Sequence, residues 1–216
     1  MTAHRSSAVR RREIADVALA IFGETGLTGL TIAAIAKKVG VTDAALFRHF
    51  GSKHDVISAA IDRAEEILFQ GFPPSPEDPL DRLGEFFRAR VRALRENPGV
   101  AKLMMSEHLA EVAPWATARL QGFRRRSQRF VRARIDEAGA KGMIGSHLAP
   151  GVATVLVLGA IMALAHGPVV VRVGQPSADA VWNALERALF GPGEARPGPR
   201  SGSGRRAGRQ QARRVR

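Results

Sequence analysis

The 216-residue sequence contains no cysteine, and this absence excludes several kinds of chemistry at once. Disulfides, thiolate catalysis, cysteine–metal sites and thiol redox switches all require that side chain. There is also no glycine-rich phosphate loop and no nucleophile elbow, and the 20 acidic residues are scattered. We therefore predict no enzymatic activity and no cofactor. His108, His147 and His166 are solitary, which predicts no metal site.

A long uninterrupted apolar segment is lacking as well. The most apolar stretch, residues 152–165, has fourteen residues, whereas a membrane span needs about 20. Proline and glycine stand on both sides of this stretch. This pattern favours a helix buried on all sides over a membrane span. The first residues are polar and basic, with no apolar run behind them, and this predicts no secretory signal.

Positive charge is in excess, but the excess is not uniform. The net charge is +13, and residues 191–216 hold +7 of it, with eight basic residues and one acidic residue. Residues 1–60 and 61–190 hold +3 each. The C-terminal segment contains almost no apolar bulk, so 191–216 is predicted to be a disordered basic tail. The overall charge is therefore no proof of a basic surface on the folded part.

Residues 31–53, TIAAIAKKVGVTDAALFRHFGSK, have the pattern of two short helices joined by a tight turn. Thr31 and Thr42 are suitable N-caps for the two helices. Gly40 suits the left-handed conformation that the turn between them requires. Apolar residues recur at helical spacing in both segments: Ile32, Ile35, Ala36 and Val39, then Leu46 and Phe50. The pattern is that of a helix-turn-helix that reads duplex DNA; the alternative is an ordinary helix pair with a basic face.

The flanking sequence favours DNA binding. Residues 1–12 carry Arg5, Arg10, Arg11 and Arg12 and no acid, which is typical of an arm that contacts phosphates. An apolar stripe from Ile14 onward predicts a helix that Gly26 ends. Three short helices around one core form the smallest unit that carries such a reading helix.

Residues 10–60 resemble the N-terminal domain of the TetR family of bacterial transcriptional repressors. The matching segments are IADVALAIFGETG, LTIAAIAKKVGVTDAALFRHFGSK and HDVISAAI, of which LFRHFGSK is the most specific. The resemblance implies phosphate contacts at Thr31, His49 and Lys53, and major-groove contacts at Thr42, Ala44 and Ala45. Phe47 stands where the family usually has a phosphate-binding tyrosine. Arg48 has the reach for a guanine or for a phosphate.

The chain as a whole is predicted to be all-α, with a three-helix DNA-binding domain and a larger helical domain for ligand binding and dimerisation. We assign residues 1–53 to the DNA-binding domain with its basic arm and 54–190 to the second domain. Further helices are expected at 54–70, 80–96, 100–112, 114–138, 150–166 and 178–190, with an extended connector at 168–176.

Methionine and aromatic residues in the middle helices are candidates for an adaptable apolar ligand pocket, although at helical spacing such residues are also ordinary core. The candidates are Phe86, Phe87, Met104, Met105, His108, Trp115 and Phe123. A run of arginines from Arg124 to Arg132 predicts a solvated helix face; an acidic ligand or a DNA-facing surface is the alternative.

Small residues at Gly159, Ala160 and Ala163 suit close packing between helices, and the last helix has an apolar side. Two copies of this helix pair would form a four-helix bundle, as the resemblance implies. We therefore predict a homodimer that binds a palindromic operator in double-stranded DNA. Its expected role is that of a cytoplasmic, nucleoid-associated repressor released by a small apolar or amphipathic effector. The alternative is a DNA-bound scaffold of the nucleoid-occlusion type that recruits a protein partner without a ligand.

Overall fold

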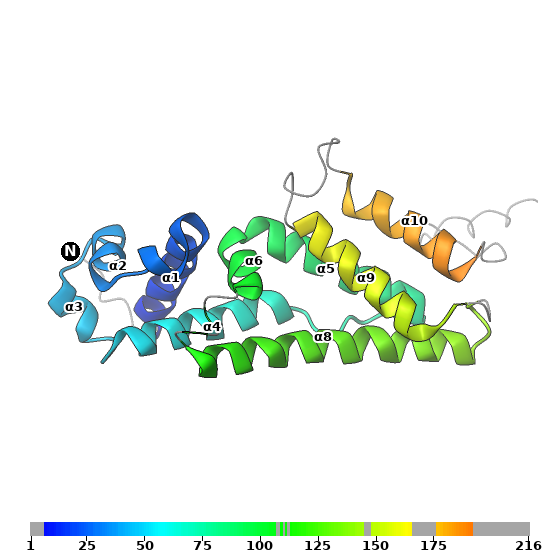
Figure 1. The fold of residues 1–216 in the computed structure, drawn as a ribbon, viewed down its shortest axis with the longest axis horizontal. Helices are drawn as coiled ribbons and strands as arrows, with labels where there is room; N and C mark the ends of the chain where they lie inside the picture. The colour runs from blue at the N-terminus through cyan, green and yellow to red at the C-terminus, as the bar shows by residue number, and fades with distance from the viewer. Residues whose placement is uncertain are drawn as a thin grey trace, which may run out of the picture.

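The structure is a computed structural model that describes residues 7–106, 109, 111, 113–144, 148–165 and 176–191. Every regular element in these ranges is a helix, so the predicted all-α fold is confirmed (Figure 1). The helices are α1 (Ser7–Gly29), α2 (Ile32–Val39), α3 (Asp43–Phe47), α4 (Lys53–Phe69), α5 (Pro79–Glu96), α6 (Pro98–Met105), α8 (Pro114–Ala140), α9 (Pro150–Ala165) and α10 (Ala178–Phe190). The predicted connector at 168–176 lies almost wholly outside the described residues, as does the predicted tail beyond Gly191.

The molecule is elongated, with α1, α2 and α3 at one end and α5, α9 and α10 toward the other (Figure 1). Helix α4 packs against α1 and also against α8, while α5 packs against α8, α9 and α10. Lys53, the residue at which we divided the two domains, is the first residue of α4. The helix that follows the reading motif is therefore also part of the larger helical body.

Three helices have bounds that clearly differ from the sequence prediction. The first helix kinks at Gly26, where φ is 70°, and one more turn carries it to Gly29. The reading helix, for which the spacing of Leu46 and Phe50 predicted a helix reaching Phe50, is only Asp43–Phe47. The short middle helix begins at Pro98 and ends at Met105. Proline suits the first position of a helix because that residue needs no N–H partner, so Pro98 starts α6 as well as following the end of α5.

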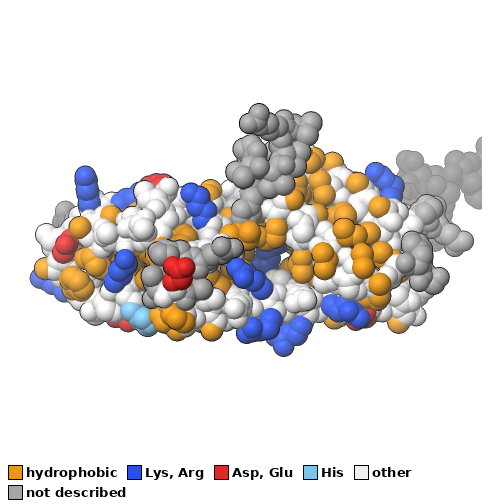
Figure 2. Space-filling model, in the orientation of Figure 1, with side chains coloured by type: hydrophobic (Ala, Val, Ile, Leu, Met, Phe, Trp, Pro, Cys, Tyr) orange, Lys and Arg blue, Asp and Glu red, His pale blue; other side chains and the backbone are white. Residues whose placement is uncertain are grey.

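Helix α9 is not buried on all sides, contrary to our prediction. Its inner face packs into the core through Ala153, Val157 and Ile161. The outer face exposes Val155, at 69%, together with Val152 and Leu156. Hydrophobic side chains gather on the surface over this helix (Figure 2). In the described part of the chain, no helix is long and apolar enough to cross a bilayer.

The backbones of α1 and α6 touch directly. A β-carbon at Gly99 would clash with the Leu19 carbonyl group, and one at Gly23 would lie 2.9 Å from the Gly99 nitrogen. The Lys102 ammonium donates a hydrogen bond to the Gly23 carbonyl oxygen at the same crossing. Only glycine permits this close approach. The reading domain is therefore held against α6 as well as α4.

Candidate nucleic-acid interface and ligand cavity

Helix α2 is set by two local signals that the sequence displays. The Thr31 hydroxyl oxygen accepts a hydrogen bond from the Ala34 amide at 3.1 Å. At the other end, Gly40 adopts a left-handed conformation with φ of 77°, and its amide donates to the Ala36 carbonyl. Both ends of the helix are thus capped, as the sequence predicted. The Thr31 hydroxyl proton remains available to donate to a phosphate oxygen.

Helix α3 is capped in the same way, since the Thr42 hydroxyl accepts from the Ala45 amide at 3.1 Å. Leu46 and Phe50 are buried beneath the reading motif. The predicted DNA-contacting residues face outward or lie at the edge of this surface: Thr31, Thr42, Ala44, Phe47, Arg48 and Lys53 are exposed, and Ala45 and His49 are partly exposed. The structure thus brings these residues to one end of the molecule.

The predicted basic arm is different in the structure, because residues 7–12 are the first turns of α1. Arg10 pairs with Glu13 at 2.9 Å, and Arg12 pairs with Glu66 at 3.3 Å. The Arg11 guanidinium carbon lies 4.3 Å from the centre of the Phe50 ring, and this side chain donates to the His49 carbonyl. The exposed Arg11 side chain therefore holds the end of the reading motif through its contacts with Phe50 and His49. Arg5 lies outside the described residues.

Phe47 offers a direct test of the interface, because its ring is 48% exposed. We expect Phe47→Tyr to retain or increase operator affinity, since the added hydroxyl can donate to a phosphate and costs nothing in burial. Gel-shift titration of both proteins on the same operator measures this. A loss of affinity of more than about tenfold, about 1.4 kcal/mol, would show that the ring does not face the DNA.

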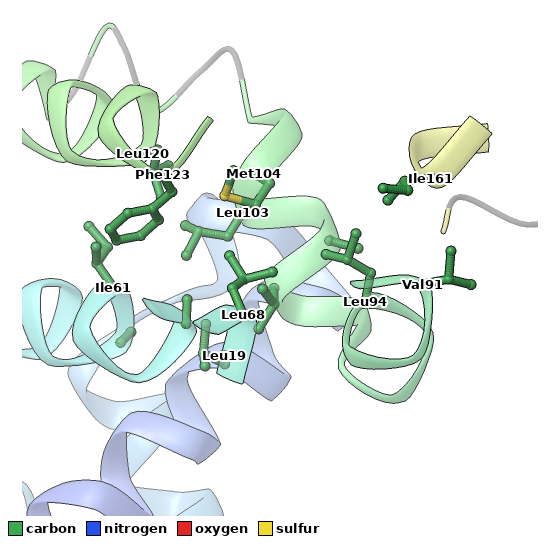
Figure 3. Close-up of a cluster of buried hydrophobic side chains, with 14 of the residues drawn as sticks. Leu19, Ile61, Leu68, Val91, Leu94, Leu103, Met104, Leu120, Phe123 and Ile161 are labelled. Atoms are coloured by element: carbon green, nitrogen blue, oxygen red, sulfur yellow. The ribbon is translucent and has the colours of Figure 1, made fainter. Parts of the chain in front are cut away.

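The middle of the molecule holds a cavity of about 300 Å³. Four of the predicted pocket residues line it: Phe86, Met104, Met105 and Phe123. Side chains from five helices meet here, and Figure 3 labels Leu68, Leu94, Met104, Phe123 and Ile161 among them. The remaining lining residues are Arg90, Arg124, Ser127, Gln128, Leu158 and Met162. The walls are therefore mainly apolar with a few polar groups, as small-molecule sites usually are.

Three predicted pocket residues are not placed in this cavity. Phe87 is fully buried in the core, with its ring centre 5.5 Å from that of Trp182 on α10. The Trp115 ring centre lies 4.0 Å from that of His54, with the two rings tilted, and Trp115 lines a separate hollow near Lys53. His108 lies outside the described residues. For Phe87 the reason is geometric, because consecutive residues on a helix point about 100° apart.

Arg90 is the cavity residue that sequence reasoning missed. It is only 7% exposed, and burial, together with the positive charge of Arg126, lowers its pKa to about 10. The group therefore remains protonated at neutral pH. Its helical spacing was a usable signal, since Arg90 lies midway between the inward residues Phe86 and Leu94, one turn from each.

The fold and sequence both have known relatives. Residues 14–60 match the family described as "Bacterial regulatory proteins, tetR family". Over 127 residues the chain is 29% identical to the nucleoid occlusion factor SlmA of Haemophilus influenzae (strain PittGG), a match that covers 56% of this chain. The chain spans only 58% of the length of that curated relative.

Two solved structures have a similar fold. The ketosteroid transcriptional regulator KstR2 of Mycobacterium tuberculosis superposes with a TM-score of 0.69 at 18% identity, covering 84% of this chain and 95% of that one. AibR in complex with isovaleryl coenzyme A and operator DNA superposes with a TM-score of 0.67 at 18% identity, covering 85% and 99%. Residues 14–60 therefore match the DNA-binding domain model of the TetR family of bacterial regulatory proteins, and the chain as a whole shares the fold of these two regulators.

Proposed function

We propose that this chain is a transcriptional regulator, in the first instance a repressor, that binds a palindromic operator through α2 and α3. The observation that carries the proposal is the exposed, doubly capped reading motif within residues 14–60. Its outward residues include Ala44, with a methyl group suited to a thymine methyl, and Arg48, with a fork suited to guanine. The proposed place of action is the bacterial nucleoid, in the cytoplasm.

A homodimer is part of the proposal, because one short reading helix contacts too few base pairs for selective binding. The outer face of α9 supports it. Val152, Val155, Leu156, Gly159 and Ala163 are all exposed and share one side of the helix. A contiguous apolar patch of this kind marks a protein interface more often than free surface. The small residues Gly159 and Ala163 would let a partner helix approach closely.

The effector would bind in the cavity and act through α6. Met104 and Met105 on this helix line the cavity, while Gly99, at its other end, touches α1 of the reading domain. A ligand that displaces α6 therefore also displaces α1, and with it the spacing of the two reading helices in the dimer. Coupling between two such sites is typically about 1–3 kcal/mol. AibR, whose structure contains both a ligand and operator DNA, has the same overall fold.

A second candidate function is a DNA-bound scaffold that recruits a protein partner without a small ligand. The observation in its favour is the similarity to SlmA, a nucleoid occlusion factor. The two functions differ in the distribution of sites. A repressor binds a few operators beside the genes it controls, whereas a scaffold binds many dispersed sites, which genome-wide mapping of bound DNA distinguishes.

DNA binding is tested by gel-shift titration of the full chain on the DNA that flanks its own gene, with salt varied. We expect a palindrome-dependent shift that Lys53→Ala weakens about equally on all sequences. The salt slope of log K should fall by about one unit, because one phosphate contact is removed.

Lys141→Ala is the matched control, since Lys141 lies at the far end of α8 and pairs with Glu137 at 3.1 Å. This control should bind DNA as the unmodified protein does. Equal affinity for operator and scrambled DNA in the unmodified protein would contradict a local repressor. A Lys53→Ala variant that lost only sequence preference would contradict the phosphate contact.

A further inference from the structure

Arg90 is a buried cation without a buried anion. It belongs to the inward face of α5 and lines the cavity. One of its terminal nitrogens donates to the Ser127 hydroxyl at 3.3 Å, which is a long hydrogen bond, and its Nε has no partner. Arginine has five N–H donors and is stable in an apolar setting only when most of them are used.

The surroundings offer aromatic rings and another cation in place of a carboxylate. The guanidinium carbon lies 4.6 Å from the Phe69 ring centre and 5.0 Å from that of Phe86. The Arg126 guanidinium carbon also lies 4.0 Å from the Phe69 ring centre, and Arg126 is itself paired, at 3.6 Å, with Glu65. Among the described residues, no acidic side chain forms an ion pair with Arg90. Cation–π contacts compensate for only part of the lost hydration.

The rest of the cavity is suited to a hydrocarbon body. Leu68, Leu94, Met104, Phe123 and Ile161 form apolar walls that come from α4, α5, α6, α8 and α9 (Figure 3). Ser127 and Gln128, both on α8, line the same cavity as Arg90 and supply further polar groups. The volume of about 300 Å³ is at the lower end of the range for small-molecule sites. The cavity therefore combines the buried positive charge of Arg90, and the exposed one of Arg124, with a small apolar chamber.

We infer that the effector is a small amphipathic anion, whose carboxylate pairs with Arg90 and whose hydrocarbon part fills the apolar chamber. Arginine binds carboxylates with two parallel hydrogen bonds, which would use the donors that the protein leaves without partners. This inference deepens the proposed function. The claim that the bound anion acts as an effector rests on that function. The binding event itself does not require DNA.

The test is a calorimetric titration of the full chain, without DNA, with octanoate and with its neutral counterpart octanamide. The two probes have the same hydrocarbon chain and differ in charge. We expect octanoate to bind at least about tenfold more tightly, because a hydrogen bond to a charged group is stronger than one between neutral groups. Arg90→Gln should abolish the difference between the two probes.

Arg92→Gln is the matched control, since Arg92 is an exposed arginine on the same helix. It should keep the preference for octanoate. Equal binding of octanoate and octanamide by the unmodified protein, no binding of octanoate, or an unchanged preference in Arg90→Gln would each overturn the inference. If Arg90→Gln fails to fold, the comparison of the two probes on the unmodified protein still tests whether the cavity prefers an anion.

The gel shift separates this inference from the proposed function. A preference for octanoate without operator selectivity would support the anion site and contradict the repressor proposal. Selective operator binding without a difference between the two probes would support the repressor proposal and contradict the anion site.

Discussion

Phe50→Ala is expected to destabilise the protein by about 3–5 kcal/mol, the usual cost of removing a buried aromatic side chain. Phe50 is 1% exposed, and it lies below the short reading helix. The Arg11 guanidinium stacks on its ring. Helix α3 has only five residues and is too short to be stable alone, so loss of this support should also abolish operator binding. Thermal unfolding followed by circular dichroism should show a Tm lower by about 10 °C.

Phe47→Ala provides the contrast, because the two phenylalanines are three positions apart and differ in burial. The Phe47 ring is half exposed, so its removal should change stability by less than about 1 kcal/mol. Its effect should be confined to DNA affinity. If both variants keep the Tm of the unmodified protein, Phe50 does not support the reading helix. If Phe47→Ala alone lowers the Tm, Phe47 is the buried residue of the motif and Phe50 the exposed one.

Gly99→Ala is expected to separate the reading domain from α6. The new methyl group would collide with the Leu19 carbonyl group, which is backbone and therefore moves only with the whole of α1. Overpacking of this kind costs about 1–3 kcal/mol. We expect a lower Tm together with a weaker operator complex, because the effect imitates the displacement that the effector is proposed to cause.

The control for this glycine is Gly122→Ala. Gly122 lies inside α8 with open space where the methyl group would be placed. Alanine is the better helix former by about 0.5–1 kcal/mol, so this variant should be as stable as the unmodified protein or slightly more so. A Gly99→Ala variant that is equally stable and binds DNA normally would show that α1 and α6 do not need their close contact.

Sequence reasoning succeeded where structure is determined locally. The caps at Thr31 and Thr42 and the left-handed turn at Gly40 are decided by residues within four positions of one another. Such signals are visible in a single sequence. The apolar face of α5 likewise depends on spacing within one helix, and the structure buries the apolar residues that recur there, Leu80, Leu83, Phe86, Phe87, Val91 and Leu94.

The cavity could be predicted only in part, because it depends on contacts between helices. Helical spacing indicates that Phe86 and Phe87 both point inward. It does not indicate that Phe86 faces the cavity whereas Phe87 packs against Trp182, which is distant in the sequence. Contacts between distant segments also explain why the ion pairs of the predicted basic arm could not be foreseen. Arg12 reads as a free cation until the fold brings Glu66 beside it.

The exposed apolar face of α9 has a consequence for how the protein responds to its own abundance. If two chains must meet through Val152, Val155 and Leu156 before either is fully shielded from water, stability depends on concentration by mass action. The Tm should therefore rise as the protein is concentrated. At low cellular levels, operator occupancy should follow the square of the chain concentration, so that halving expression reduces occupancy about fourfold.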